Sequence, residues 1–124
     1  MLKISREEDN IFVLEIFEPR LATDEKEFIL FLDEVFQNSK FGIVLSVTGH
    51  KFFSLEGKKT FNMWFKENKD RLKRQCFGFA RVSSETSKML KLTSKALRLA
   101  MPCRYEVFNE KKDGVHWLQR NRTK

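Results

Sequence analysis

The sequence predicts a single α/β domain over residues 1–124, with a mixed β-sheet and helices on both faces. Strand-like runs alternate with helical periodicities along the chain, as in folds where crossover helices join parallel strands. One run, Ile43 to Val47, is apolar on both faces apart from Ser46, which is typical of a central strand covered on both sides. The length of 124 residues suits one domain with its own core.

Two strands and a helix are expected before this central strand. Leu2 to Arg6 and Ile11 to Phe17 are rich in β-forming residues, and the polar turn between them predicts an antiparallel hairpin. Asp24 followed by Glu27 indicates a helix N-cap and its capping-box partner. Apolar residues at helical spacing then predict a helix from about Asp24 to Gln37.

The alternation continues after the central strand. The expected elements are a helix from about Leu55 to Arg74, a strand from Cys76 to Val82, a helix from about Glu85 to Ala100, a strand from Arg104 to Phe108, and a short helix from Asp113 to Gln119. The last helix is the weakest of these elements because it contains Gly114. The predicted order is β-β-α-β-α-β-α-β-α.

Composition indicates a globular protein with a basic surface. The chain is 41% hydrophobic and contains thirteen phenylalanines, which we interpret as a Phe-packed core rather than a pocket or membrane face. The net charge is +7, from 24 basic and 17 acidic residues. This charge favours an acidic partner: a nucleic acid, an anionic membrane surface or an acidic protein.

Neither a signal core nor a membrane-spanning run is evident. The first residues lack an apolar core, and no segment approaches the roughly 20 apolar residues that cross a bilayer. We therefore expect a cytoplasmic protein. Cys76 and Cys103 lie among apolar residues without a CxxC spacing. They are expected to be reduced, buried thiols rather than a disulfide or a metal pair.

The most informative motif is the central strand together with the loop and helix start that follow it, Ile43 to Gly57. With the later strand Glu106 to Phe108 and the segment Val115-His-Trp-Leu118, it resembles the STAS / SpoIIAA-like domains, the fold of anti-sigma factor antagonists. The resemblance extends over almost the whole chain. The long, basic second helix is similar to the SpoIIAA-like branch, sometimes grouped with STAS/SEC14-type domains.

The helix start departs from the regulatory members of that family. Those members carry Asp-Ser-Ser-Gly-Leu, whose first serine accepts a phosphate, whereas this chain reads Ser54-Leu55-Glu56-Gly57-Lys58. Ser54 matches the family's aspartate and is expected to cap the helix. Leu55 replaces the acceptor serine, and Glu56 adds a permanent negative charge. The resemblance therefore implies a binding surface without a phosphoswitch.

The resemblance implies a non-enzymatic binding module that presents this loop and helix start. The expected contact residues are His50, Ser54, Leu55, Glu56 and Gly57. Either a protein partner or an apolar ligand such as a lipid would fit, and the latter requires a cavity under the Phe-rich helices. The sequence leaves both monomer and homodimer open.

The sequence gives little support for catalysis or for a bound metal or cofactor. His50 and His116 have no Cys, His or carboxylate at ligand spacing, so no metal site is expected. A Ser54–His50 dyad would lack an orienting carboxylate and an evident oxyanion hole. The chain also has no Walker loop and no GxGxxG motif, so we expect neither an enzyme nor a nucleotide cofactor.

A basic stripe on the predicted third helix supports an alternative function. It comprises Lys88, Lys91, Lys95 and Arg98. The stripe is either a solvated helix face or a surface that docks onto an anionic membrane or an acidic partner. The alternative function is thus a peripheral membrane or lipid-binding module that uses basic amphipathic helices. Nucleic acid is disfavoured because no recognised reading motif is present.

Overall fold

Five strands form one mixed sheet in the computed structural model, which describes residues 1–8, 10–17, 21, 23–47, 55–82, 99 and 101–122. The strands are β1 (Leu2–Glu8), β2 (Ile11–Ile16), β3 (Phe41–Val47), β4 (Cys76–Val82) and β5 (Tyr105–Phe108). They lie side by side in chain order, so β3 is central, as predicted. β1 and β2 form the expected antiparallel hairpin, and the other neighbouring pairs are parallel.

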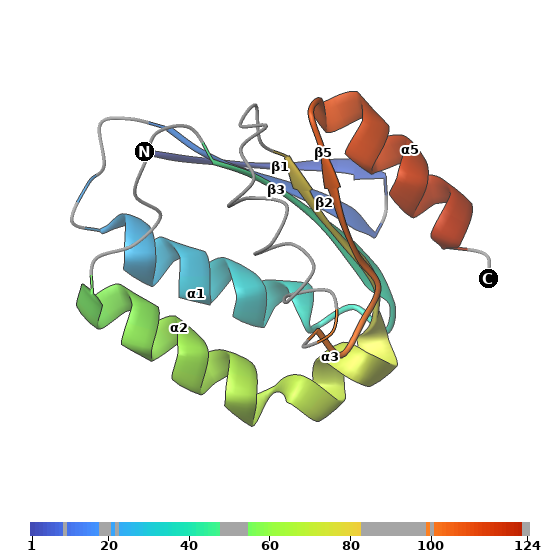
Figure 1. The fold of residues 1–124 in the computed structure, drawn as a ribbon. Coiled ribbons are helices and arrows are strands. Elements are labelled where there is room, and N and C mark those ends of the chain that lie inside the picture. Colours follow the sequence, from blue (N-terminus) through green and yellow to red (C-terminus); the bar gives the residue numbers. More distant parts are fainter. Residues whose placement is uncertain are drawn as a thin grey trace.

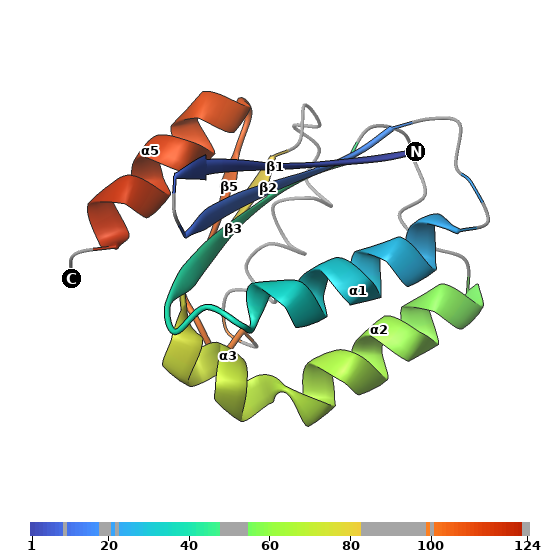
Figure 2. The ribbon, with the colours of Figure 1, turned by 180° about the vertical axis from the view of Figure 1, so that it is seen from behind.

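Helices cover both faces of the sheet, which confirms the predicted α/β class. They are α1 (Asp24–Val35), α2 (Leu55–Glu67), α3 (Lys69–Gln75) and α5 (Lys111–Asn121). Figure 1 shows α1 and α2 side by side below the sheet and α5 above it, and Figure 2 shows the same layers from behind. Apart from Leu99, which is helical and exposed, the helix expected over residues 85–100 lies outside the described residues.

The predicted second helix is interrupted, so a single helix from Leu55 to Arg74 was wrong. The interruption falls at Asn68, whose φ of -107° and ψ of 13° depart from helical values. Its side-chain amide donates to the Trp64 carbonyl oxygen at 2.8 Å. Asparagine makes such local bonds readily, and they compete with regular helix geometry. The chain therefore forms α2 and then the short α3.

The predicted cap of the first helix was also wrong. Thr23 occupies the N-cap position without a side-chain cap bond, and Asp24 is the first helical residue. The Asp24 carboxylate instead accepts hydrogen bonds from the Leu21 backbone N–H at 2.8 Å and from the Met1 amino group at 2.6 Å. The side chain is thus used to hold the preceding segment rather than to cap the helix. The helix also ends earlier than predicted, at Val35.

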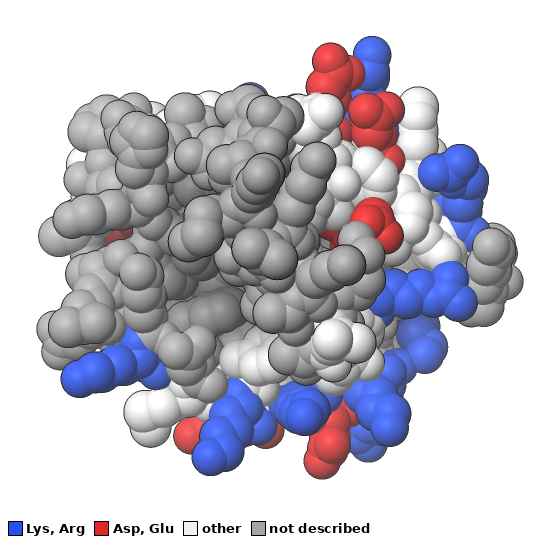
Figure 3. Space-filling view, viewed as in Figure 1, with Lys and Arg blue, Asp and Glu red and all other residues white. Residues whose placement is uncertain are grey.

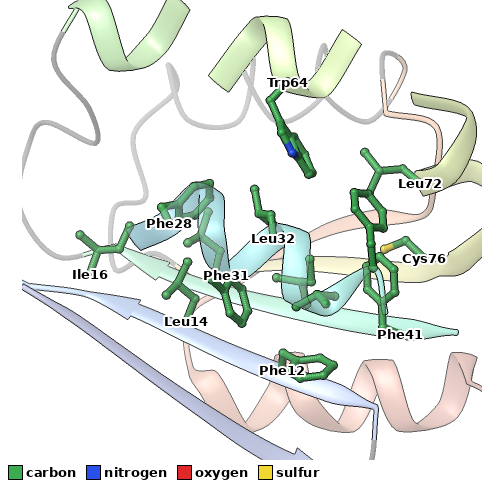
Figure 4. Close-up of a cluster of buried hydrophobic side chains, with 14 residues drawn as sticks. Phe12, Leu14, Ile16, Phe28, Phe31, Leu32, Phe41, Trp64, Leu72 and Cys76 are labelled. Atoms are coloured by element: carbon green, nitrogen blue, oxygen red, sulfur yellow. The ribbon is translucent and has the colours of Figure 1, made fainter. Parts of the chain in front are cut away.

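An aromatic layer fills the space between the sheet and the helices α1, α2 and α3. Its buried phenylalanines are Phe12, Phe28, Phe31, Phe36 and Phe41. Phe36 stacks on Trp64 with ring centroids 5.4 Å apart, and Phe12 meets Phe31 edge-on at 6.0 Å. Figure 4 shows Trp64 reaching from α2 toward Leu32 of α1. For these residues the Phe-packed core is confirmed.

A second, smaller core lies beneath α5. Gly42 and Gly78 are paired across β3 and β4, and Leu118 of α5 is fully buried over them. Gly114, predicted to weaken this helix, is itself buried, and a Cβ there would lie 3.2 Å from the Ala80 Cβ. Glycine thus lets α5 approach the sheet closely, and the packing supports a helix longer than the predicted one.

Candidate functional site

The predicted binding segment leaves the sheet at the carboxyl ends of its parallel strands. β3 ends at Val47, and α2 begins at Leu55, as predicted for the helix start. Ligands of open α/β sheets bind at this edge, in the crevice outside the strand ends. His50 and Ser54 lie outside the described residues. Of Leu55, Glu56 and Gly57 the structure describes only the helical backbone, so their contact role stays a prediction.

The basic stripe of Lys88, Lys91, Lys95 and Arg98 also lies outside the described residues and stays a prediction. A different basic surface is described on α2 and α3. Its exposed cations are Lys59, Lys66, Lys69, Arg71, Lys73 and Arg74, interspersed with the exposed acids Glu67 and Asp70. Figure 3 shows lysine and arginine gathered along the lower margin of the molecule, over these two helices. We call this surface the α2–α3 basic face.

The opposite edge of the sheet holds an open pocket of about 440 Å³. It lies where the amino ends of β3, β4 and β5 meet the end of α3 and the last turn of α5. The pocket is lined by Lys40, Lys73, Cys76, Phe77, Pro102, Cys103, Arg104 and Asn121. The lining residues include three cations and no carboxylate, so the pocket has a positive potential that favours anions.

The two cysteines of the chain meet at this pocket. Both are free thiols, and Cys76 is buried as predicted, but Cys103 is partly exposed, so the prediction of two buried thiols was wrong for Cys103. A hydrogen bond between the two thiols raises the pKa of Cys76, and burial raises it further. The same bond lowers the pKa of Cys103, an effect that burial opposes. Cys103 is therefore the thiol that ionises first.

Sequence reasoning missed this pairing because the two cysteines are far apart in the chain. One signal could have found it: Cys76 opens one predicted strand, and Cys103 directly precedes the next. Because neighbouring parallel strands begin at the same edge of a sheet, their first residues lie close together. Backbone pairing confirms this arrangement, with the Phe79 N–H donating to the Arg104 carbonyl oxygen at 2.8 Å.

The described part of the chain contains no candidate metal site. Residues 1–8, 10–17, 21, 23–47, 55–82, 99 and 101–122 contain no group of three His, Cys, Asp or Glu side chains that could hold a metal ion. His116 lies exposed on α5. Within the same residues, no helix combines the length and the apolar character needed to cross a membrane.

The fold is similar to that of a protein of known structure. The layered sheet is α/β, and it is similar to the crystal structure of an uncharacterized protein of the DUF3478 family from Shewanella loihica PV-4, which has a SpoIIAA-like fold. The two structures superpose with a TM-score of 0.64 at 12% sequence identity, covering 95% of this chain and 92% of the other. The chain therefore has a SpoIIAA-like fold, as its sequence predicts. No family model and no curated protein matches the sequence.

Proposed function

We propose that the protein is a non-enzymatic, SpoIIAA-like binding module that presents residues 50–57 to a protein partner. The SpoIIAA-like fold supports the module, and the place of Val47 and Leu55 at the carboxyl edge supports the segment. Leu55 stands where the phosphorylated serine of the regulatory members would be. The surface is therefore constitutive, without control by a kinase.

The packing between the sheet and the helices α1 and α2 favours a protein partner over an apolar ligand. A lipid would need a cavity there, under α1 and α2. Instead, the side chains from both layers interdigitate, and Phe28, Phe31 and Leu32 are at most 3% exposed. Trp64 extends from α2 to the same layer and donates to Asp33 of α1 at 3.2 Å. The close packing of these described side chains supports a protein partner over a lipid chain.

Site-specific photocross-linking tests the proposed surface. Lys51, inside the segment, is replaced by p-benzoylphenylalanine in the host cell, and the matched control carries the same replacement at Lys112, exposed on α5. We expect a discrete cross-linked protein band from position 51 and none from position 112. Equal products from both positions, or none from position 51, would contradict the proposed surface.

A second candidate function is docking onto an anionic membrane surface. The observation that favours it is the α2–α3 basic face, where long cationic side chains project together from neighbouring helices (Figure 3). Such side chains gain favourable energy near acidic lipid headgroups, and salt screens that gain. The predicted stripe on residues 88–98 would extend the same function to a second surface.

A further inference from the structure

A β-bulge at the start of β4 sets the direction of the Cys76 side chain. Phe41 pairs with Cys76, but the next residue of β3, Gly42, pairs with Gly78, so Phe77 is an additional residue in β4. Side chains alternate along a regular strand, which would place Cys76 on the same face as Gly78, beneath α5. The bulge instead places Cys76 in the aromatic layer, against which Cys103 also packs. Bulges often re-aim a side chain in this way next to functional sites.

The two thiols of this pair differ in accessibility and in acidity. Cys76 is only 6% exposed and donates a hydrogen bond to the Gly78 carbonyl oxygen at 3.2 Å. Cys103 is partly exposed in the pocket and has the lowered pKa. An accessible thiol with a lowered pKa next to a buried thiol with a raised pKa matches the division into an attacking and a resolving cysteine.

Three cations surround the pair, and two of them are held in place. The Lys40 ammonium donates to the Arg74 carbonyl oxygen at 2.6 Å, and the Arg104 guanidinium donates to the side-chain oxygen of Asn121. Lys73 lies exposed in the last turn of α3. These charges favour a reactant that carries carboxylates.

We propose that Cys103 and Cys76 form a thiol–disulfide exchange site for small anionic disulfides, such as glutathione disulfide. The Cys103 thiolate attacks one sulfur of the disulfide, forms a mixed disulfide and releases one thiolate. Cys76 then loses its proton and attacks the Cys103 sulfur, which releases the second thiolate. The small disulfide is reduced to two thiols, and the protein is oxidised. The new Cys76–Cys103 disulfide links the start of β4 to the segment that precedes β5.

Intact-mass analysis of the reduced, folded protein treated with glutathione disulfide tests this site. We expect the wild type to lose two hydrogens and to retain no glutathione. Cys76→Ser should accumulate one glutathione adduct on Cys103, and Cys103→Ser should react about tenfold more slowly than the wild type. Equal rates for Cys103→Ser and the wild type would overturn the proposal, and so would a wild type that stays reduced while free cysteine reacts.

A charge variant that leaves both thiols intact separates the pocket from general thiol reactivity. Lys73→Glu should slow the reaction with glutathione disulfide by about threefold, because it reverses a charge at the pocket. The same variant should leave the reaction with neutral hydroxyethyl disulfide unchanged. Lys66→Glu on α2, outside the pocket lining, is the matched control. Equal slowing by both variants, or no slowing by Lys73→Glu, would contradict the assigned role of the pocket.

Discussion

Gly78 and Leu118 show how strongly single residues determine the packing of α5. A Cβ at position 78 would lie 2.6 Å from Leu118 Cδ2 and 3.1 Å from the Trp117 ring. Because Leu118 is fully buried, it cannot turn into solvent to avoid such a group. The close approach of helix and sheet thus depends on the absence of a side chain in β4.

Gly78→Val should therefore destabilise the protein by about 1–3 kcal/mol through overpacking. Leu118→Ala alone should cost about 2–5 kcal/mol because it leaves a cavity. The double variant should lose less stability than the sum of the two, since the valine occupies part of the space that Leu118 vacates. Unfolding in urea, monitored by tryptophan fluorescence, measures the free energy of unfolding of all three variants. Strict additivity would show that the two positions do not share this space.

The neighbouring Cys76 thiol leads to a prediction about the pH dependence of Cys103 reactivity. Hydrogen bonding to Cys76 is the largest influence on the pKa of Cys103 and lowers it, so iodoacetamide should alkylate native Cys103 at a pH below the roughly 8.5 at which free cysteine is half ionised. Cys76→Ala removes the neighbouring thiol that lowers the Cys103 pKa and should move the midpoint of the rate–pH profile to higher pH. A midpoint that stays in place would mean that another group sets the acidity of Cys103.

Among the elements, α1 and α2 are joined through Trp64. Its ring stacks on Phe36, and its indole N–H reaches Asp33. Trp64→Phe keeps the stacking but loses the hydrogen bond, and it should cost about 1 kcal/mol. Trp64→Ala should cost about 3–5 kcal/mol. Thermal unfolding measures both, with Met63→Ala, at a neighbouring position 64% exposed, as the control that should stay within about 0.5 kcal/mol.

Most elements were predictable because their signals are local. β2 and β3 are dense in β-forming apolar residues, and the apolar spacing of α1 gives its helical face directly. The break at Asn68 was not predictable from apolar periodicity, which continues through it to Leu72. The role of Asp24 was missed because its side chain binds Leu21, a contact that depends on how the preceding segment folds back.

For the whole molecule, the hairpin and the central place of the third strand were predicted, but the full order of strands in the sheet was not. The apolar run of β3 correctly placed it at the centre of the sheet. The Cys76–Cys103 pairing needs both the adjacency of β4 and β5 and the bulge at Phe77. The place of each cysteine at a strand start points to the adjacency, but the bulge leaves no periodic signal in the sequence. The contact residues around His50 and the stripe around Lys91 stay predictions for experiment.

Vesicle sedimentation decides which basic surface, if either, contacts an anionic membrane. Each cation near such a surface contributes about 1 kcal/mol at low salt. Lys91→Glu/Lys95→Glu should abolish sedimentation if residues 88–98 make the contact, and Lys59→Glu/Lys66→Glu should abolish it if the α2–α3 basic face does. Circular dichroism checks that each variant remains folded. A wild type that ignores anionic vesicles at low salt would mean that both surfaces are merely solvated.

Native mass spectrometry of the purified protein tests the central claim most directly, because it separates a protein-binding module from a lipid carrier. The filled layer around Phe28, Phe31 and Trp64 predicts the mass of the chain alone, as a monomer or a homodimer. Gentle desolvation would preserve a lipid buried between α1, α2 and the sheet. A stoichiometric co-purified lipid, released only on unfolding, would contradict the account.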